Sequence, residues 1–363
     1  MKIINLNNNK IFPNVSILVV NYNGKHHFEE FLSSIFKLNY PKKSYEIIIV
    51  DNASDDGSIE FLRNKYLDHI KERKNPKIKI INFKKNYGFS LGNNLGVNYC
   101  DSEYIALINN DTVVDPYWLS NLMKYAVKNP KAIYGSLMLR YDNKNVIVYA
   151  GGRILYWGYP LHIHTYEIYS KHLFPDRPIS TFYADGCGLL ISKELFLNLG
   201  GFDPNYFAYA EDYELCWKAW IYGYKVYFVP SAIFWHKISS TLGRRSSLYL
   251  YLLWRNQFTN ILKFCDGIYC ITMPILYVCF GALTGLIIFG IQERNSRILV
   301  SIIKGIIDSI KHLPYILKQR KLLHNKKKIT CNDLKRNYML LDFKSSLLET
   351  IMFLRRASKI NIV

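Results

Sequence analysis

Short apolar runs alternate with amphipathic segments through the first 130 residues of the chain. Four runs have the length and β-branched content of buried strands: 15–20, 45–50, 78–83 and 104–108. Between and after them the spacing predicts helices over 27–38, 58–66, from about 90 to Cys100, and 117–127. Strand and helix in alternation predict an α/β fold with a Rossmann-like, mostly parallel, doubly wound sheet and flanking helices.

Three of these runs end in polar or aromatic residues that are candidates for binding. Ligands of open α/β sheets bind at the carboxyl ends of strands, where Tyr22, Asp51 and Asp111 are expected. Asp111 is placed where a carboxylate can meet a divalent cation and substrate phosphates. Its alternative role is to form a turn or cap a helix. Asp51 is placed to contact a ribose or a base edge, and Tyr22 could stack on a base.

The Gly/Asn-rich segment 86–96 leads into one of the predicted helices. Backbone amides at a helix N-terminus favour a diphosphate, although glycines that only form a turn explain the segment as well. The first strand is followed by Asn-Tyr-Asn-Gly rather than GxGxxG, and no P-loop lysine signature occurs. These absences argue against a dinucleotide fingerprint and a P-loop.

The second half of the chain carries a carboxylate pair and a histidine with two possible roles each. Section 135–185 has little periodicity, and a tight turn leads from it into a predicted strand ending at Ser192. Glu211 and Asp212 then begin an amphipathic helix that ends at Gly223, either complementing the helix dipole or presenting a general base. After a predicted strand over 225–229, His236 closes a short apolar run, as a structural residue or as a metal or phosphate ligand.

Charge is concentrated at the C-terminal end. The 363 residues carry a net charge of +19, and residues 292–363 hold 16 Lys or Arg against 5 Asp or Glu, a net +11. This asymmetry indicates an acidic partner, an anionic membrane or a nucleic acid. The seven cysteines form no CxxC pair, which fits a reducing compartment.

The most apolar segment lies beside this charge. Residues 268–291 carry no charge and could span a bilayer, but the basic flanks favour a re-entrant or interfacial insertion. Helices are predicted at 247–263 and about 344–357. Between them an apolar stripe predicts a basic amphipathic helix kinked at Pro314, which could instead form a coiled coil or pack on the rest of the protein: Leu299, Ile303, Ile306, Ile310, Leu313 and Leu317.

Taken in order, seven motifs resemble those of family 2 glycosyltransferases. Within this family they are most similar to those of the rhamnosyltransferase-like branch. The motifs are SILVVNYNG, IIIVDNASDDGS, NYGFSLGNNLG, LINNDTVVDP, GCGLLIS, GGFDPNYFAYAEDYELCWK and FWH, within residues 13–262. The resemblance implies a GT-A fold, a nucleotide-diphosphate sugar donor, inversion at the anomeric carbon and a Mg or Mn cation.

The resemblance also implies roles for individual residues. Asp111 matches the last acid of a DXD-type metal motif whose first acid is Asn109 here, and His236 matches a histidine that completes the metal site in some members. Asp212 matches the base, the second acid of an ED motif that begins with Glu211. Lys218 stands where the branch often has Arg, which removes a bidentate contact. The residues expected near the donor are Tyr22, Asn23, Asp51, Asn86, Phe89, Asn93 and Asn110.

These expectations describe a catalytic domain over 1–262 and a membrane-association region over 263–363. The enzyme would move a sugar, from dTDP-rhamnose or a UDP-sugar, to a lipid-linked or cell-surface glycan at the cytoplasmic face of the membrane. No nucleic-acid partner is expected, because the excess charge lies beside the most apolar segment. The alternatives are a nucleotidyltransferase of related fold and a non-catalytic basic protein that binds membrane or nucleic acid.

Overall fold

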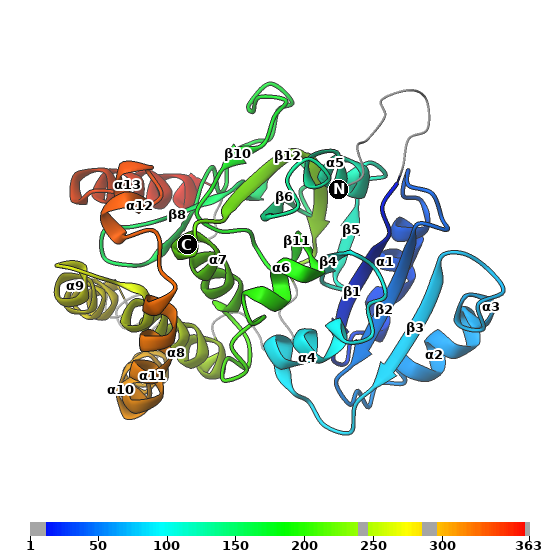
Figure 1. Ribbon diagram of the computed structural model, residues 1–363, viewed down its shortest axis with the longest axis horizontal. Helices are drawn as coiled ribbons and strands as arrows, with labels where there is room; N and C mark the ends of the chain where they lie inside the picture. The colour runs from blue at the N-terminus through cyan, green and yellow to red at the C-terminus, as the bar shows by residue number, and fades with distance from the viewer. Residues whose placement is uncertain (1–11, 239–245, 285–295, 360–363) are drawn as a thin grey trace.

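Four parallel strands form the first half of the sheet, as the apolar runs predict. The computed structural model describes residues 12–238, 246–284 and 296–359 (Figure 1). The strands lie in the order β4-β1-β2-β3. Val15 pairs with both Tyr45 and Tyr104, and Asn21 pairs with Asp51, so β1 and β2 end at one level. The bounds are β1 Val15–Asn21, β2 Tyr45–Asp51, β3 Lys77–Asn82 and β4 Tyr104–Ile108.

Helices cover this half because their apolar faces fit the buried, β-branched surface of the sheet. In α1 the residues Phe28, Phe31, Leu32 and Ile35 are buried, which is the stripe expected of an amphipathic helix on a sheet. Helix α4 packs on β1 and β2. The bounds are η1 Lys25–His27, α1 Phe28–Phe36, α2 Ser58–Lys65, α3 Leu67–Ile70, α4 Gly88–Val97 and α5 Trp118–Ala126.

The second half of the sheet is mixed, which corrects the expectation of a mostly parallel sheet. Strand β11 (Gly188–Ser192) lies between β4 and β6 (Ala132–Arg140) and is antiparallel to both. Strand β12 (Lys225–His236) is parallel to β6, whereas β5 (Thr112–Val114), β7 (Ile147–Tyr149) and β10 (Ile179–Ser180) form antiparallel pairs. Hydrophobic periodicity carries no information on strand direction, so the reversal could not be read from it.

Strand β12 unites two segments that appear separate in the sequence. Its register against β6 shifts between Val229 and Ile233, around Pro230. Proline cannot donate to a ladder and is tolerated in strands at such irregularities. The bulge lets the strand continue to His236. Section 135–185 supplies, besides most of β6, strands β7 and β10 and the hairpin of β8 (Gly152–Ile154) with β9 (Pro160–His162).

The C-terminal third is a layer of helices against the domain that contains the large sheet (Figure 1). Helices α10 and α11 pack along α8, which also contacts α7. The expected domain boundary after residue 262 falls inside α8. The bounds are α6 Lys193–Asn198, α7 Glu211–Ile221, α8 Ser247–Phe264, α9 Tyr269–Thr284, α10 Ser296–Lys311, α11 Leu313–Asn325, α12 Cys331–Arg336 and α13 Phe343–Lys359.

One expectation for this region changes. The helix predicted to kink at Pro314 is two helices, α10 and α11, with Pro314 in the first turn of α11, where its missing N–H costs no helical hydrogen bond. Within the described ranges, no helix combines the length and the apolar character needed to cross a bilayer. Of the uncharged segment 268–291, the part up to 284 is largely α9, and 285–291 lie outside the described residues.

Part of the predicted apolar stripe of α10 points outward. Ile303 is 46% exposed and Ile310 is 54% exposed, while Gly305 and Ser309 face α8. A Cβ on Gly305 would come within 2.7 Å of the carbonyl oxygen of Tyr251, so glycine permits the close approach of the two helices. The helix therefore approaches α8 closely through Gly305 and Ser309 and buries Ile302, while Ile303 and Ile310 stay at the surface.

Candidate active site

Asp111 lies at the carboxyl end of β4, in the turn to β5, and meets His236 directly. Thr112 pairs with His236 across the β5–β12 ladder, which brings the imidazole beside the carboxylate. His236 Nε2 lies 3.0 Å from Asp111 Oδ1, and the backbone amide of Lys237 donates to the Asp111 carbonyl at 2.9 Å. Asp111 is only 7% exposed. Backbone register thus assembles a nearly buried carboxylate–imidazole pair.

A second histidine, unassigned in the sequence, is close to this pair. His27 in η1 is buried, and burial lowers its pKa to about 4, with the charge of His26 acting in the same direction. The negative charge of Asp111 opposes this shift in pKa. The ring is therefore neutral at physiological pH. Its position at the start of a helix after β1 gave no chemical signal in the sequence.

Asp212 is the second residue of α7, and its carboxylate accepts a hydrogen bond from the turn before β11. The Gly186 amide donates to Asp212 Oδ2 at 2.8 Å, and the Tyr213 amide lies 2.7 Å from Oδ1. Burial, and next the charge of Asp185, raise the pKa of Asp212 to about 7. A carboxylate with such a pKa can accept a proton near neutral pH.

Glu211, the other acid of the pair, is more enclosed. It is buried, and its Oε2 finds no hydrogen-bond partner among the described residues. Burial, and then the charge of Asp212, raise the pKa of Glu211 well above its usual range. Of the two acids, Asp212 is therefore the one better suited to act as a base.

The turn at residues 185–187 connects the two acids, which are far apart along the chain. The Asn109 side chain, two residues before Asp111, donates to Cys187 Sγ at 3.1 Å, while Gly186 binds Asp212. Burial, and then the charges of Asp185, Asp111 and Asp212, raise the pKa of the Cys187 thiol. Asp111 and Asp212 thus flank one turn. Asp185 had no assigned role, although its Ala-Asp-Gly-Cys context was visible in the sequence.

Phe89 lies beside this turn. A Cβ built on Gly186 would be 3.4 Å from the Cβ of Asp212 and 3.5 Å from Phe89 Cε1. The ring and the carboxylate therefore border the same glycine, and the first turn of α4 reaches the turn at 185–187. Asn86 and Asn93 bind their own segment instead, Asn86 accepting from the Gly88 amide and Asn93 donating to the Phe89 carbonyl.

The N-terminal amides of α4 are already occupied, contrary to the expectation of a diphosphate site there. The amides of Phe89 and Ser90 donate to the carbonyl of Phe207, at 2.7 and 3.4 Å. Gly88 has φ +77°, and a Cβ there would lie 2.3 Å from the same carbonyl. The absence of a side chain at Gly88 thus allows α4 to contact the loop before α7. Asn52, which had no assigned role, is buried and supports this segment by donating to the Gly88 carbonyl at 2.9 Å.

The residues expected near the nucleoside differ in accessibility. Tyr22 is 37% exposed. Asn23 accepts from the Asp55 amide, and Asn110 donates to the Asn21 side chain at 2.6 Å. Asp51 is fully buried and accepts hydrogen bonds from Asn21 and Ser54. In this conformation Asp51 organises the following loop and offers no open surface, so its contact with a donor stays a prediction.

The donor set around Asp111 fits a divalent cation only in part. One carboxylate and one imidazole suit Mn²⁺ and are acceptable to Mg²⁺. Among the described residues, no group of three or more His, Cys, Asp or Glu side chains could hold a metal. The pair therefore fits a cation that takes its remaining ligands from the substrate diphosphate.

These features define a class of protein: a mixed sheet with an acid–imidazole pair at its carboxyl edge, opposite a carboxylate at a helix start, is the architecture of a GT-A glycosyltransferase. The family model described as Glycosyl transferase family 2 matches residues 16–200, just over half of the chain. The chain belongs to this family, as the motifs indicated.

Solved structures and curated relatives agree with this assignment. GalNAc-T7, solved with UDP, GalNAc and Mn²⁺, superposes with a TM-score of 0.61 at 17% identity, covering 85% of this chain and 58% of that one. S. aureus TarS 1-349 in complex with UDP-GlcNAc gives a TM-score of 0.54 at 15% identity, with 86% and 87% covered. These structures confirm the GT-A fold.

Among curated sequences, the chain is similar to a poly-beta-1,6-N-acetyl-D-glucosamine synthase of Staphylococcus epidermidis. The two are 27% identical over 234 residues, which is 63% of this chain and 51% of the relative. The chain thus spans about half the length of the curated relatives it matches.

Proposed function

We propose that this protein is an inverting glycosyltransferase that moves a sugar from a nucleotide-diphosphate donor to a hydroxyl of a cell-surface glycan. The observation that carries the proposal is the placement of Asp111 with His236 and of Asp212 around the single turn 185–187. One side of the turn suits a diphosphate and its cation, and the other a proton acceptor. The sugar would lie between them.

The reaction we propose is a single displacement. Asp212 takes the proton of the acceptor hydroxyl as that oxygen forms a bond to the anomeric carbon from the face opposite the diphosphate. The bond from that carbon to the diphosphate oxygen breaks, and the nucleoside diphosphate leaves with the electron pair. Asp212 needs to be ionised, and its pKa of about 7 leaves a large fraction ionised at neutral pH.

Asp111 and His236 would hold a divalent cation against the diphosphate. When bound, such a cation neutralises the charge that develops on the leaving group. Phe89, beside Gly186, would border the sugar, and the exposed Tyr22 would contact the nucleoside. The bound Mn²⁺ in the structure of GalNAc-T7 supports a cation in this role.

The similar proteins guide the choice of donor. A UDP-N-acetylhexosamine is the first candidate, because TarS is solved with UDP-GlcNAc and the curated relatives are N-acetylglucosamine polymer synthases. Rhamnose from a dTDP donor is the second candidate, because the motifs resemble the rhamnosyltransferase-like branch. For the acceptor we propose a lipid-linked glycan.

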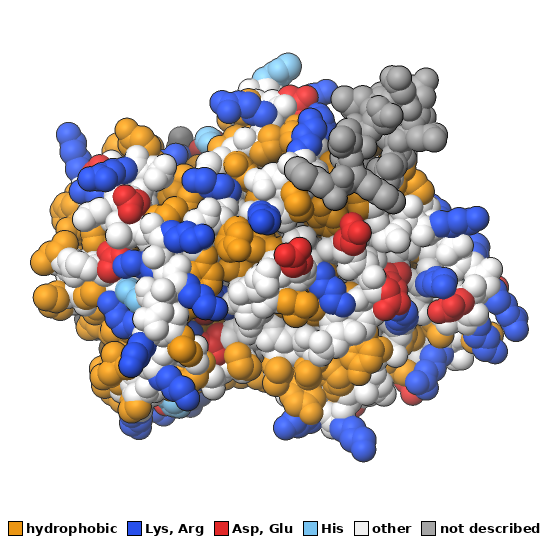
Figure 2. All heavy atoms as spheres, viewed as in Figure 1, with side chains coloured by type: hydrophobic (Ala, Val, Ile, Leu, Met, Phe, Trp, Pro, Cys, Tyr) orange, Lys and Arg blue, Asp and Glu red, His pale blue; other side chains and the backbone are white. Residues whose placement is uncertain are grey.

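The surface of the C-terminal helices supports the proposal that the protein binds the cytoplasmic face of a membrane. The large apolar side chains on α10 that are 46–54% exposed are Val300, Ile303, Ile307 and Ile310. Figure 2 shows hydrophobic side chains gathered at the edge formed by α9, α10 and α13, with Lys and Arg among them. Apolar side chains framed by cations suit an anionic bilayer surface better than a nucleic acid, which would favour charge without the apolar stripe.

A donor screen tests the function. Thermal unfolding of the full chain with Mn²⁺ would be measured with UDP-N-acetylglucosamine, UDP-glucose, dTDP-rhamnose and GDP-mannose, followed by release of nucleoside diphosphate. A donor near 100 times its dissociation constant should stabilise the fold by about 2.7 kcal/mol. If no nucleotide sugar in the screen stabilises the protein and none is turned over, the proposal is refuted.

A further inference from the structure

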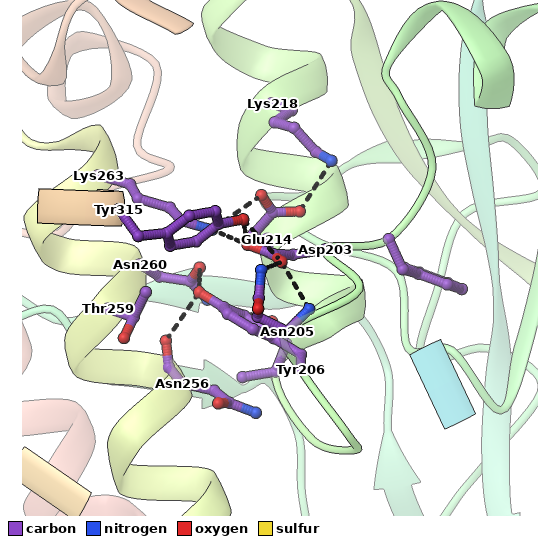
Figure 3. Close-up of polar contacts among 12 residues, drawn as sticks. Asp203, Asn205, Tyr206, Glu214, Lys218, Asn256, Thr259, Asn260, Lys263 and Tyr315 are labelled. Carbon is purple, nitrogen blue, oxygen red and sulfur yellow. Dashed lines mark hydrogen bonds and ion pairs between the residues drawn. The ribbon is translucent and has the colours of Figure 1, made fainter. Parts of the chain in front are cut away.

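The loop at residues 203–210, which leads directly to Glu211 and Asp212, is held at both ends by side chains of the C-terminal helices. Asn256 and Asn260 are one turn apart on α8 and are both fully buried. Asn256 Nδ2 donates to the carbonyls of Ala208 and Tyr209, at 3.0 and 2.7 Å. Asn260 Nδ2 donates to the carbonyl of Ala210 at 3.1 Å. Figure 3 shows both asparagines on α8, on the side of the helix that faces the loop.

The backbone that these amides hold is strained. Tyr209 has φ +73° and Ala210 has φ +64°, conformations that side chains other than glycine rarely adopt. Such residues persist where the surrounding structure fixes them. The Ala210 carbonyl also accepts the first hydrogen bond of α7, from the Glu214 amide at 3.0 Å. The direction in which α7 starts, and with it the position of Asp212, therefore depends on the loop conformation.

A buried ionic cluster holds the start of the loop. Asp203 pairs with Lys263 of α8 and accepts from the Tyr315 hydroxyl of α11 at 3.1 Å to each carboxylate oxygen. Lys263 also lies 3.5 Å from Glu214 Oε1, and Glu214 pairs with Lys218 at 2.9 Å. Figure 3 shows this cluster between α7 and α8. A buried network of this kind specifies geometry, because breaking one member leaves a buried charge uncompensated.

We propose that α8 is the positioning element for the base: Asn256 and Asn260 fix the end of the loop next to Asp212, and Lys263 with Tyr315 fixes its beginning. These are positioning residues, because none of them touches the turn at 185–187 in the contacts described above. The C-terminal helices thereby form part of the active-site architecture. This inference rests on the proposed function in assigning Asp212 as the base, and the experiment separates the two.

The experiment replaces each asparagine by leucine, which keeps the approximate volume and removes the donors. Thr259→Val is the matched control on the same helix, since the Thr259 hydroxyl contacts Ser309 of α10 rather than the loop. Tyr315→Phe removes one hydroxyl and is the milder variant if a leucine variant does not fold. Each full-length protein would be assayed for turnover and KM with the best donor of the screen, and for amide hydrogen exchange across 203–212 without ligand.

We expect turnover of Asn256→Leu and Asn260→Leu to fall about 100-fold, because a misplacement near 1 Å has that effect on rate. The donor KM should stay within about threefold, because these residues lie away from the donor side, and the 203–212 amides should exchange faster. Tyr315→Phe should follow in the same direction with a smaller loss, and Thr259→Val should match the wild type.

Turnover and exchange in the leucine variants equal to those of Thr259→Val would overturn the inference. A parallel loss of donor affinity would do so as well, because it would show general damage to the site. Should the wild type turn over no nucleotide sugar, the proposed function would fail. The exchange measurement would still decide whether α8 holds the loop.

Discussion

The two sides of the candidate active site are fixed in different ways. On the Asp111 side, backbone pairing fixes the positions of the side chains. Asp111 follows β4, and the β5–β12 ladder places His236 3.0 Å from it. On the Asp212 side, the loop before α7 holds two residues at positive φ, and side chains of α8 hold the loop. Both sides meet at the turn 185–187.

The difference indicates how robust each side is. A ladder spreads the position of a residue over many backbone hydrogen bonds, so the loss of one side chain moves it little. A loop held by a few buried amides depends on each of them, because an unpaired buried carbonyl costs about 1–3 kcal/mol. We therefore expect substitutions outside the site to affect Asp212 more than Asp111.

The largest effect is expected from Asp212→Asn. The amide cannot accept the acceptor proton, so turnover should fall by about a thousandfold or more, while donor binding stays nearly intact. Steady-state assays and calorimetric titration of the donor measure the two quantities. Asp101→Asn, at a surface acid paired with Lys79, is the control and should behave as wild type. Loss of donor binding in Asp212→Asn would contradict its role as base.

Asp111→Asn tests the opposite side. This variant should weaken Mn²⁺-dependent donor binding about 100-fold, as an amide is a poorer ligand for a hard cation than a carboxylate. The measurement is a donor titration with and without Mn²⁺. The affinity measured without Mn²⁺ should change little, and an equal loss under both conditions would argue against metal binding at this residue.

His236→Gln should have a smaller effect than Asp111→Asn. We expect about a tenfold loss of Mn²⁺ affinity, since the carboxylate remains. Titration of Mn²⁺ in the presence of saturating donor measures it. Because the β5–β12 ladder is made of backbone, the unfolding temperature should stay close to that of the wild type. A loss in Mn²⁺ affinity greater than that of Asp111→Asn would reverse the ranking of the two residues.

The pH dependence of turnover tests whether Asp212 acts as the base. A base with a pKa of about 7 loses activity as the pH falls below 7, because the carboxyl becomes protonated. Asp185→Asn removes a negative charge that disfavours ionisation of Asp212, so the pKa should fall and activity should persist to lower pH. The acid limb of the turnover profile measures the shift. An unmoved or oppositely moved limb would exclude this electrostatic coupling.

The smallest effect on catalysis is expected at the outer face of the helical layer. A double variant with Ile303→Glu and Ile310→Glu should lose binding to phosphatidylglycerol vesicles in sedimentation, yet keep turnover with a water-soluble acceptor. Leu67→Glu, at an exposed leucine on α3, is the matched control. Vesicle binding that survives the double variant would remove this surface from the proposal.

Two amphipathic helices show what periodicity can and cannot predict. In α1 the apolar face is buried in the hydrophobic core, as expected. In α10 the apolar residues Ile303 and Ile310 are exposed, and Gly305 and Ser309 face α8 instead. Both helices were predictable as helices. Which face each one buries depends on the surface that it meets, and a one-dimensional pattern does not contain that surface.

The sequence by itself determined the first four strands, the polar strand end that carries Asp111, and the helix that starts at Glu211 and Asp212. Those features follow from local periodicity and from abrupt changes between apolar and polar residues. Only the tertiary structure decided that β11 runs antiparallel, that Phe207 occupies the amides of α4, and that side chains of α8 bind the loop before Asp212. These features arise from contacts between residues far apart along the chain, where geometry rather than local composition selects the partner.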